Sequence, residues 1–145
     1  MNKQFEEELR NIYCSMYSNA NPNTLLYKEV PAYTRSVDLV EYNTSTNEIS
    51  AIEFKIKDWK RAIMQLSEVA VCFDYLMLCM PKPKTKKCIS NIKSSCKSLG
   101  IGLCFFDQIT NQFSTEYSAK NIHDIWRFQK ESIIGYLESQ EENHE

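Results

Sequence analysis

Two runs of alternating apolar and polar residues, separated by a turn-forming stretch, most constrain how this chain can fold. In residues 49–57, isoleucine or phenylalanine alternates with charged side chains from position 52 onward, and residues 35–42 show a similar alternation. A period of two is typical of strands that bury one face. Residues 43–48 between them read Asn-Thr-Ser-Thr-Asn-Glu, which favours a turn. The sequence therefore predicts an antiparallel hairpin.

The other periodic segments indicate what surrounds this hairpin. Apolar residues spaced four and three apart predict helices over 3–17, from an Asp58 cap to about 74, from a Thr85 cap to Gly100, and over 121 to about 139. Further strands are expected at 25–30, 75–80 and 101–106, with a short edge strand at 112–117. The first three strands should form an antiparallel meander, joined to strand 75–80 through the second helix. This order predicts an α/β fold with a mixed sheet and helices on both faces.

Length and composition limit the class of protein. With 145 residues and 43% hydrophobic residues, the chain is expected to form one domain over 1–145, ending in an acidic tail from about 139 to 145. The longest apolar stretch, 69–80, is interrupted by Asp74 and is shorter than the roughly 20 residues that span a bilayer. Residues 1–10 carry three glutamates and no apolar core of a signal peptide. A cytoplasmic protein without a membrane helix is expected.

Cysteine and histidine chemistry is not expected. Six cysteines occur, mostly within apolar patterns and without Cys-x-x-Cys spacing, which indicates buried reduced thiols. Of two histidines, His144 lies in the polar tail, so a Ser–His triad or a histidine zinc site would depend on His123 alone. His123 is interpreted as structural.

The hairpin brings charged residues together. Glu53, Lys55 and Lys57 share the face opposite the apolar one. If the hairpin is symmetric about residues 45 and 46, cross-strand partners have numbers that sum to 91, and Asp38 lies opposite Glu53 with Cβ atoms about 4.5–5.5 Å apart. Two adjacent carboxylates repel, which favours a bound divalent cation such as Mg²⁺. Lys55 beside it could stabilise an attacking hydroxide or a developing phosphorane charge.

The second predicted helix adds polar groups to the same end of the strand. Arg61, Gln65 and Glu68 follow i, i+4, i+7 spacing beside the apolar stripe. Taken singly, the charged hairpin residues are more typical of a solvated sheet surface with a weak salt bridge than of a site. The helix that must cover this sheet favours the interpretation as a site.

Asp38, then Glu53-Phe-Lys55, then a helix bearing Gln65 resembles the motif set of the PD-(D/E)XK nuclease superfamily, whose restriction-endonuclease-like core runs αβββαβ. The resemblance covers residues 5 to about 80. It implies a Mg²⁺- or Mn²⁺-dependent nuclease that hydrolyses phosphodiester bonds in DNA. Asp38 and Glu53 would be metal ligands together with the Phe54 carbonyl, Lys55 the catalytic lysine, and Gln65 a group that orients water or substrate. Val37 stands where the motif has proline.

Several members of this superfamily also place a glutamate of the first helix at the metal. Glu6, Glu7 and Glu8 compete for this role. At about 100° per residue, Glu8 lies roughly 70° from the centre of the apolar stripe, whereas Glu7 points nearly away, so Glu8 is the predicted metal ligand. The alternative is that these carboxylates only complement the helix dipole. Glu29, at the end of the first strand, is a rival for the same role.

The overall charge of −2 gives no general attraction to DNA, but residues 75–106 hold six lysines and no acidic residue. The predicted DNA contacts are Lys57, Arg61, Lys82, Lys84, Lys86 and Lys87; the alternative is a solvated helix face. A chain this short leaves little beyond the core for target recognition, so a homodimer or a partner subunit is expected. Two other functions remain open: a non-cleaving nuclease-fold module that binds nucleic acid or protein within a larger complex, and a plain interaction domain.

Overall fold

The structure, a computed structural model, describes residues 2–18, 20–122 and 124–142. Its elements are α1 (Asn2–Tyr17), β1 (Thr24–Ala32), β2 (Arg35–Asn43), β3 (Glu48–Phe54), α2 (Trp59–Glu68), the 3-10 turn η1 (Ala70–Cys72), β4 (Tyr75–Pro81), α3 (Lys86–Leu99), β5 (Gly102–Asp107), β6 (Gln112–Tyr117) and α4 (Arg127–Glu142). The predictions for His123 and for the last residues of the acidic tail, His144 included, lie outside the described residues.

The strands form a six-stranded mixed sheet in the order β1-β2-β3-β4-β5-β6. The pairs β1–β2, β2–β3 and β5–β6 are antiparallel, whereas β3–β4 and β4–β5 are parallel. Parallel neighbours need crossover connections, which α2 and α3 supply. The predicted meander, the mixed sheet and the αβββαβ order of the core are confirmed.

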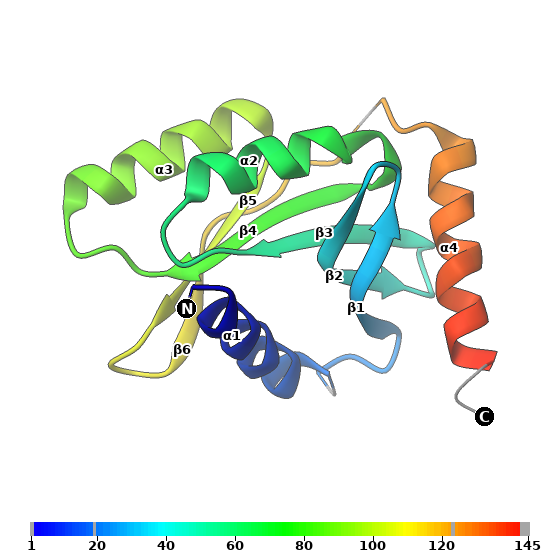
Figure 1. Cartoon of the computed structure of the whole chain (residues 1–145), viewed down its shortest axis with the longest axis horizontal. Coiled ribbons are helices and arrows are strands. Elements are labelled where there is room, and N and C mark those ends of the chain that lie inside the picture. The colour runs from blue at the N-terminus through cyan, green and yellow to red at the C-terminus, as the bar shows by residue number, and fades with distance from the viewer. Residues whose placement is uncertain (1, 19, 123, 143–145) are drawn as a thin grey trace.

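Helices cover both faces of the sheet (Figure 1). On one face α1 packs through Leu9 and Tyr13 against apolar residues of β2, β3 and β5. On the other face α2 and α3 bury Leu66, Ile92 and their neighbours in a larger core. Helix α4 adds Leu137 to that second core and packs beside β1 and η1. The sheet therefore has α1 alone on one side and the remaining helices on the other.

The predicted helix caps are present. The Asp58 carboxylate accepts a hydrogen bond from the Arg61 N–H, and the Thr85 hydroxyl accepts one from the Cys88 N–H. Gly100 ends α3 with a φ of 69°, the left-handed conformation that favours glycine. These caps set where α2 and α3 begin and end relative to the strands.

The buried face of α1 differs from the predicted stripe. Leu9 is buried as expected, but the other buried residue is Tyr13, whose hydroxyl donates a 2.6 Å hydrogen bond to Glu41 and whose ring packs on Phe54. The other members of the predicted stripe are partly exposed: Phe5 by 49%, Ile12 by 37% and Met16 by 47%. The helix is therefore rotated about its axis, because an aromatic side chain with a polar partner outcompetes an isoleucine for the sheet.

Three predicted boundaries were wrong. Helix α2 ends at Glu68 and not at about residue 74, and the 3-10 turn η1 follows it. Strand β3 ends at Phe54 and not at residue 57, because its ladder to β2 stops at Leu39↔Ile52 and its ladder to β4 stops at Phe54↔Cys79. Helix α4 begins at Arg127 and not at 121, because the preceding segment bonds to the η1 region instead of to itself. The N–H groups of Ile122 and Trp126 donate to the carbonyls of Asp74 and Val71, each at 2.8 Å.

The six cysteines are free thiols, as predicted. Cys72, Cys79, Cys96 and Cys104 are buried, and Cys14 and Cys88 are half-buried. In the described part of the chain, no helix is both long and apolar enough to cross a bilayer.

Candidate active site

The β2–β3 hairpin has the predicted register, with partners such as Leu39↔Ile52 and Val40↔Ala51 whose numbers sum to 91. Beyond the last backbone pair, hydrogen bonds to side chains connect β2 and β3. The Asp38 Oδ2 accepts a 2.9 Å hydrogen bond from the Phe54 N–H, and the Asp38 N–H donates to Glu53 Oε1 at 3.4 Å. Asp38 and Glu53 therefore meet at the point where the two strands separate.

Strand β1 also separates from β2 at this point. Lys28↔Leu39 and Val30↔Val37 are paired, but Glu29 between them has a φ of 51°. This left-handed conformation is uncommon for a residue other than glycine. Asp38 therefore lies where regular pairing is interrupted on both sides of β2.

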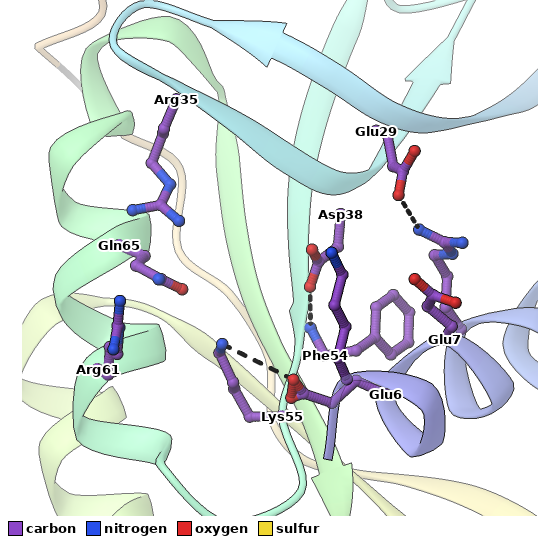
Figure 2. A pocket seen from close by; sticks show the side chains of 11 residues that line it. Glu6, Glu7, Glu29, Arg35, Asp38, Phe54, Lys55, Arg61 and Gln65 are labelled. Carbon is purple, nitrogen blue, oxygen red and sulfur yellow. Dashed lines mark hydrogen bonds and ion pairs between the residues drawn. The ribbon is translucent and has the colours of Figure 1, made fainter. Parts of the chain in front are cut away.

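A cavity of about 590 Å³ opens there. Its walls come from α1, the β1–β2 hairpin, the end of β3 and α2 (Figure 2). The lining residues are Lys3, Glu6, Glu7, Arg10, Glu29, Arg35, Asp38, Phe54, Lys55, Arg61 and Gln65. Apart from Phe54 and Gln65 they are all charged, so the cavity suits a charged ligand.

The electrostatics of Glu53 depend on whether a cation is present. The residue is 2% exposed. Burial raises the pKa of its carboxyl from 4.5 to about 8, and Asp38 adds to the rise by its charge and by a hydrogen bond between the two carboxyl groups, whereas Arg35 opposes it. Without a cation, Glu53 therefore holds a proton at neutral pH. A cation bound by both carboxylates would displace that proton.

Lys55 lies at the end of β3 and points toward α1. Its N–H donates to the Cys79 carbonyl at 3.1 Å, which fixes the backbone, and its Nζ lies 3.9 Å from Glu6 Oε1 (Figure 2). The two side chains are 19% and 18% exposed. Burial raises the pKa of Glu6, while the Lys55 ammonium partly offsets the rise and the charge of Asp38 adds to it. This ion pair holds the Lys55 ammonium inside the cavity.

Helix α2 contributes Gln65 and Arg61 to the cavity, as predicted from their spacing. Gln65 is 6% exposed, and its Oε1 has no hydrogen-bond partner among the described residues. Figure 2 shows this amide oxygen pointing into the cavity, toward the side where Asp38 lies. A buried acceptor without a partner costs about 1–3 kcal/mol, so the cavity offers a ready hydrogen bond to a ligand or to water.

The first-helix glutamate beside the site is not the predicted one. Glu8 is exposed and lines a separate, largely apolar hollow with Phe5 and Ile12, whereas Glu6 and Glu7 line the cavity. The reason is the rotation of α1 that buries Tyr13. The prediction that Glu7 points away was wrong for the same reason. Glu29, the rival candidate, does line the cavity.

The predicted DNA-contacting lysines lie outside the cavity. Only Arg61 among those predicted contacts lines it. The others are exposed and follow β3 or β4, so they lie beyond the ends of these two parallel strands: Lys57, Lys82, Lys84, Lys86 and Lys87. Their contact with DNA stays a prediction.

Sequence reasoning missed Arg35 and Arg10. Arg35 precedes Asp38 by three residues, so regular alternation would place the two side chains on opposite faces. Arg35 and Asp38 nevertheless both line the cavity, because the strand pairing of β2 is interrupted at Asp38. Arg35 Nη1 lies 3.3 Å from Glu68 Oε2, and Arg10 Nη1 lies 3.5 Å from Glu29 Oε1. No sequence signal marks either pair.

The donor set fits a hard divalent ion through two carboxylates. Within residues 2–18, 20–122 and 124–142, no cluster of three or more His, Cys, Asp or Glu side chains has the geometry of a metal site. Mg²⁺, however, commonly takes only one or two carboxylates, with water and substrate oxygens. The Phe54 N–H points to Asp38, and the carbonyl of a strand residue points to the same neighbouring strand. Asp38, Glu53 and the Phe54 carbonyl are therefore the oxygen donors that would hold such an ion; Asp38 and Phe54 line the cavity, whereas Glu53 is buried and is not among its lining residues.

Comparison with known proteins establishes likeness in fold only. No protein-family model and no curated protein matches the chain. The solved structure of SPO1766, a protein of unknown function from Silicibacter pomeroyi, is 13% identical with a TM-score of 0.68, and the match covers 96% of this chain and 88% of that one. SfsA of Pyrococcus furiosus, solved in complex with Ca²⁺, is 13% identical with a TM-score of 0.40 over 81% of this chain and 62% of that one. At that distance SfsA carries no argument about this chain.

Proposed function

We propose that this chain is a Mg²⁺- or Mn²⁺-dependent nuclease of the PD-(D/E)XK type that hydrolyses phosphodiester bonds in DNA. The observation that carries the proposal is the contact between Asp38 and Glu53 at the end of β3, next to a charged cavity that Asp38 and Lys55 line and Glu53 does not. A buried carboxyl pair is unfavourable unless a proton or a cation compensates it. An adjacent lysine is one of the groups that can stabilise the negative charge that develops during phosphodiester hydrolysis.

Each residue has a distinct role in this proposal. Asp38, Glu53 and the Phe54 carbonyl hold the ion, which would supply Lewis-acid stabilisation of the scissile phosphate. Lys55 orients the attacking water and stabilises negative charge that develops on the phosphate. The unpartnered Gln65 Oε1 accepts a hydrogen bond from that water. Glu6 is a positioning residue, because it holds the Lys55 ammonium.

DNA would reach the cavity along the exposed basic residues beyond β3 and β4. Lysine and arginine side chains that contact phosphates release counterions, so binding should weaken steeply as salt rises. The proposed contacts are Lys57, Arg61, Lys82, Lys84, Lys86 and Lys87.

A DNA cleavage assay with Mg²⁺ or Mn²⁺ tests the proposal. Wild-type protein should cleave linear DNA, single- or double-stranded, and EDTA should abolish cleavage. Lys55→Met keeps the apolar stem but removes the charge, so cleavage should fall by about 10²–10³, as for one preorganised electrostatic group. Lys120→Met, at an exposed position outside the cavity, is the matched control and should keep wild-type activity. Folded wild-type protein that cleaves no DNA form with either ion would refute the proposal.

A second candidate is a non-cleaving module that binds nucleic acid, or a protein partner within a larger complex. Two observations favour it. The Lys55 ammonium already pairs with Glu6, and the carboxylates near Glu53 do not form a three-ligand cluster within the part of the chain that the structure describes. Salt-dependent DNA binding without cleavage by the wild type would support this candidate over the nuclease.

A further inference from the structure

The wall of the cavity formed by β2 and α2 carries two guanidinium groups that have no role in the chemical step of the proposed hydrolysis, although Arg61 is among the proposed DNA contacts. Arg35 begins β2 and Arg61 lies in the first turns of α2, and both line the cavity. Figure 2 shows Arg35, Gln65 and Arg61 following one another along this wall, with Lys55 facing them. Of the acidic lining residues, Glu6, Glu7 and Glu29 belong to α1 and β1, and Asp38 belongs to β2.

The Arg35 guanidinium is held in place by one ion pair, but not all of its N–H donors have hydrogen-bond partners. Glu68, whose side chain is 46% exposed, pairs with the Arg35 Nη1 at 3.3 Å, which fixes the guanidinium plane. The Arg35 Nε is buried and has no partner among the described residues. An unpaired buried donor is unfavourable, and a planar guanidinium presents several donors in a fork that matches phosphate oxygens. The free donors of Arg35 therefore suit an anionic ligand.

Arg61 and Gln65 complete the wall. No described carboxylate lies within 4.0 Å of the Arg61 guanidinium. Gln65, which is more than nine-tenths buried, directs an unpartnered acceptor into the same space. A phosphate monoester and its ordered water offer acceptor oxygens to both arginines and a donor to Gln65. A phosphate diester inside a strand offers fewer anionic oxygens.

The position of these arginines indicates a strand end. Arg35 and Asp38 are three residues apart on β2, about 10 Å along the strand. Beyond Arg35 the chain turns back into β1, and the β1–β2 hairpin bounds this side of the cavity (Figure 2). A volume of about 590 Å³ lies within the range of pockets that hold small ligands. A strand that reaches Asp38 would therefore meet the hairpin wall shortly beyond it.

We infer that Arg35 and Arg61 form a binding site for a terminal phosphomonoester, so that the nuclease acts at a phosphorylated end of a DNA strand. Cleavage at a phosphorylated end rests on the proposed function, whereas binding of the terminal phosphate does not. Glu68 acts as a positioning residue that holds Arg35. The same chemistry is present at a 5′-phosphate and at a 3′-phosphate, so both ends are tested.

The test compares linear DNA bearing a 5′-phosphate, a 3′-phosphate or hydroxyl ends with a covalently closed circle. One phosphorylated end should be cleaved about 10- to 100-fold faster than hydroxyl ends, the range for a charge-assisted hydrogen bond. The closed circle should be resistant. Arg35→Met should abolish the preference between ends, and Arg35→Lys, which keeps the charge without the fork, should reduce it. Arg127→Met is the matched control: it removes an exposed arginine that also pairs with a glutamate, and this variant should retain the wild-type preference between ends.

A second measurement does not depend on cleavage or on the fold of one variant. Thymidine 5′- and 3′-monophosphate and unphosphorylated thymidine are titrated in EDTA against wild type, Arg35→Met and Arg61→Met, with thermal unfolding as the control for folding. A monophosphate should bind the wild type at least 10-fold more tightly than thymidine does, and either variant should remove that difference.

The possible failures are distinguishable. Cleavage of the circle as fast as of linear DNA, or equal cleavage of all ends, would overturn the inference and leave the nuclease intact. If no DNA is cleaved but the monophosphate binds through Arg35, the proposed function fails and the phosphate site stands. If no monophosphate binds preferentially to folded wild type, the phosphate site is refuted.

Discussion

Replacement of Glu53 by glutamine should remove a pH dependence of stability that the metal-free protein otherwise shows. Burial and the neighbouring Asp38 raise the pKa of Glu53 from 4.5 to about 8. Between these values the native protein holds a proton that the unfolded chain has released. Stability is therefore greatest at low pH and falls as pH rises toward 8, the reverse of a carboxylate in a salt bridge.

The size of the effect follows from the pKa difference. One bound proton changes the free energy of unfolding by about 1.36 kcal/mol per pH unit. From pH 5 to 8, a group with native and unfolded pKa values near 8 and 4.5 should therefore lose about 3 kcal/mol of stability. Domains of this kind are stable by about 5–15 kcal/mol, so the loss is measurable. Glu53→Gln, which is neutral at every pH, should stay near the wild-type stability at pH 5 throughout the range.

Urea unfolding in EDTA, followed by circular dichroism at pH 5, 6, 7 and 8, measures this difference. Glu138→Gln, at an exposed position on α4, is the matched control and should retain the wild-type slope. Saturating Mg²⁺ should stabilise the wild type more at pH 8 than at pH 5.5, because the ion replaces the proton. A wild-type stability that is constant or rises from pH 5 to 8, or the same slope in Glu53→Gln, would refute this description of the site.

Three further outcomes are expected. Asp38→Ala should abolish divalent-ion binding and cleavage, and it should lower the stability of the apo protein by about 1–3 kcal/mol because the buried Phe54 N–H loses its acceptor, as calorimetry and urea unfolding would measure; retained ion binding would contradict it. Glu6→Gln should lower cleavage, because Lys55 loses its partner, whereas Glu8→Gln should not; equal effects in the cleavage assay would contradict the observed rotation of α1. Alanine should replace four exposed lysines together: Lys82, Lys84, Lys86 and Lys87. This variant should bind DNA more weakly and with a flatter salt dependence, and an unchanged slope would mean that these lysines do not contact phosphates.

The hairpin and its register could be predicted because both depend on local pattern. A period of two and a turn of polar residues placed Asp38 opposite Glu53, and the observed pairs Leu39↔Ile52 and Val40↔Ala51 have that register. The caps at Asp58 and Thr85 are local in the same sense, since the accepting side chain and the donating backbone N–H are three residues apart. These features required no knowledge of tertiary contacts.

Other features of the site depend on contacts between distant residues. The choice between Glu6 and Glu8 follows from Tyr13, whose hydroxyl reaches Glu41 across 28 residues. A hydropathy stripe ranks isoleucine above tyrosine and cannot register that hydrogen bond. Arg35 enters the cavity because pairing stops on both sides of Asp38, and regular alternation would have placed it on the other face.

The central claim is that Asp38 and Glu53 together hold a divalent ion, and calorimetric titration of the metal-free protein with Mn²⁺ or Mg²⁺ tests it most directly. At pH 7, in two buffers with different ionisation enthalpies, the wild type should bind the ion with release of about one proton, because Glu53 is protonated beforehand. Asp38→Ala and Glu53→Ala should lose binding, and Lys55→Met should retain or strengthen it. Folded wild type that binds neither ion, or binding that survives in both alanine variants, would contradict the claim.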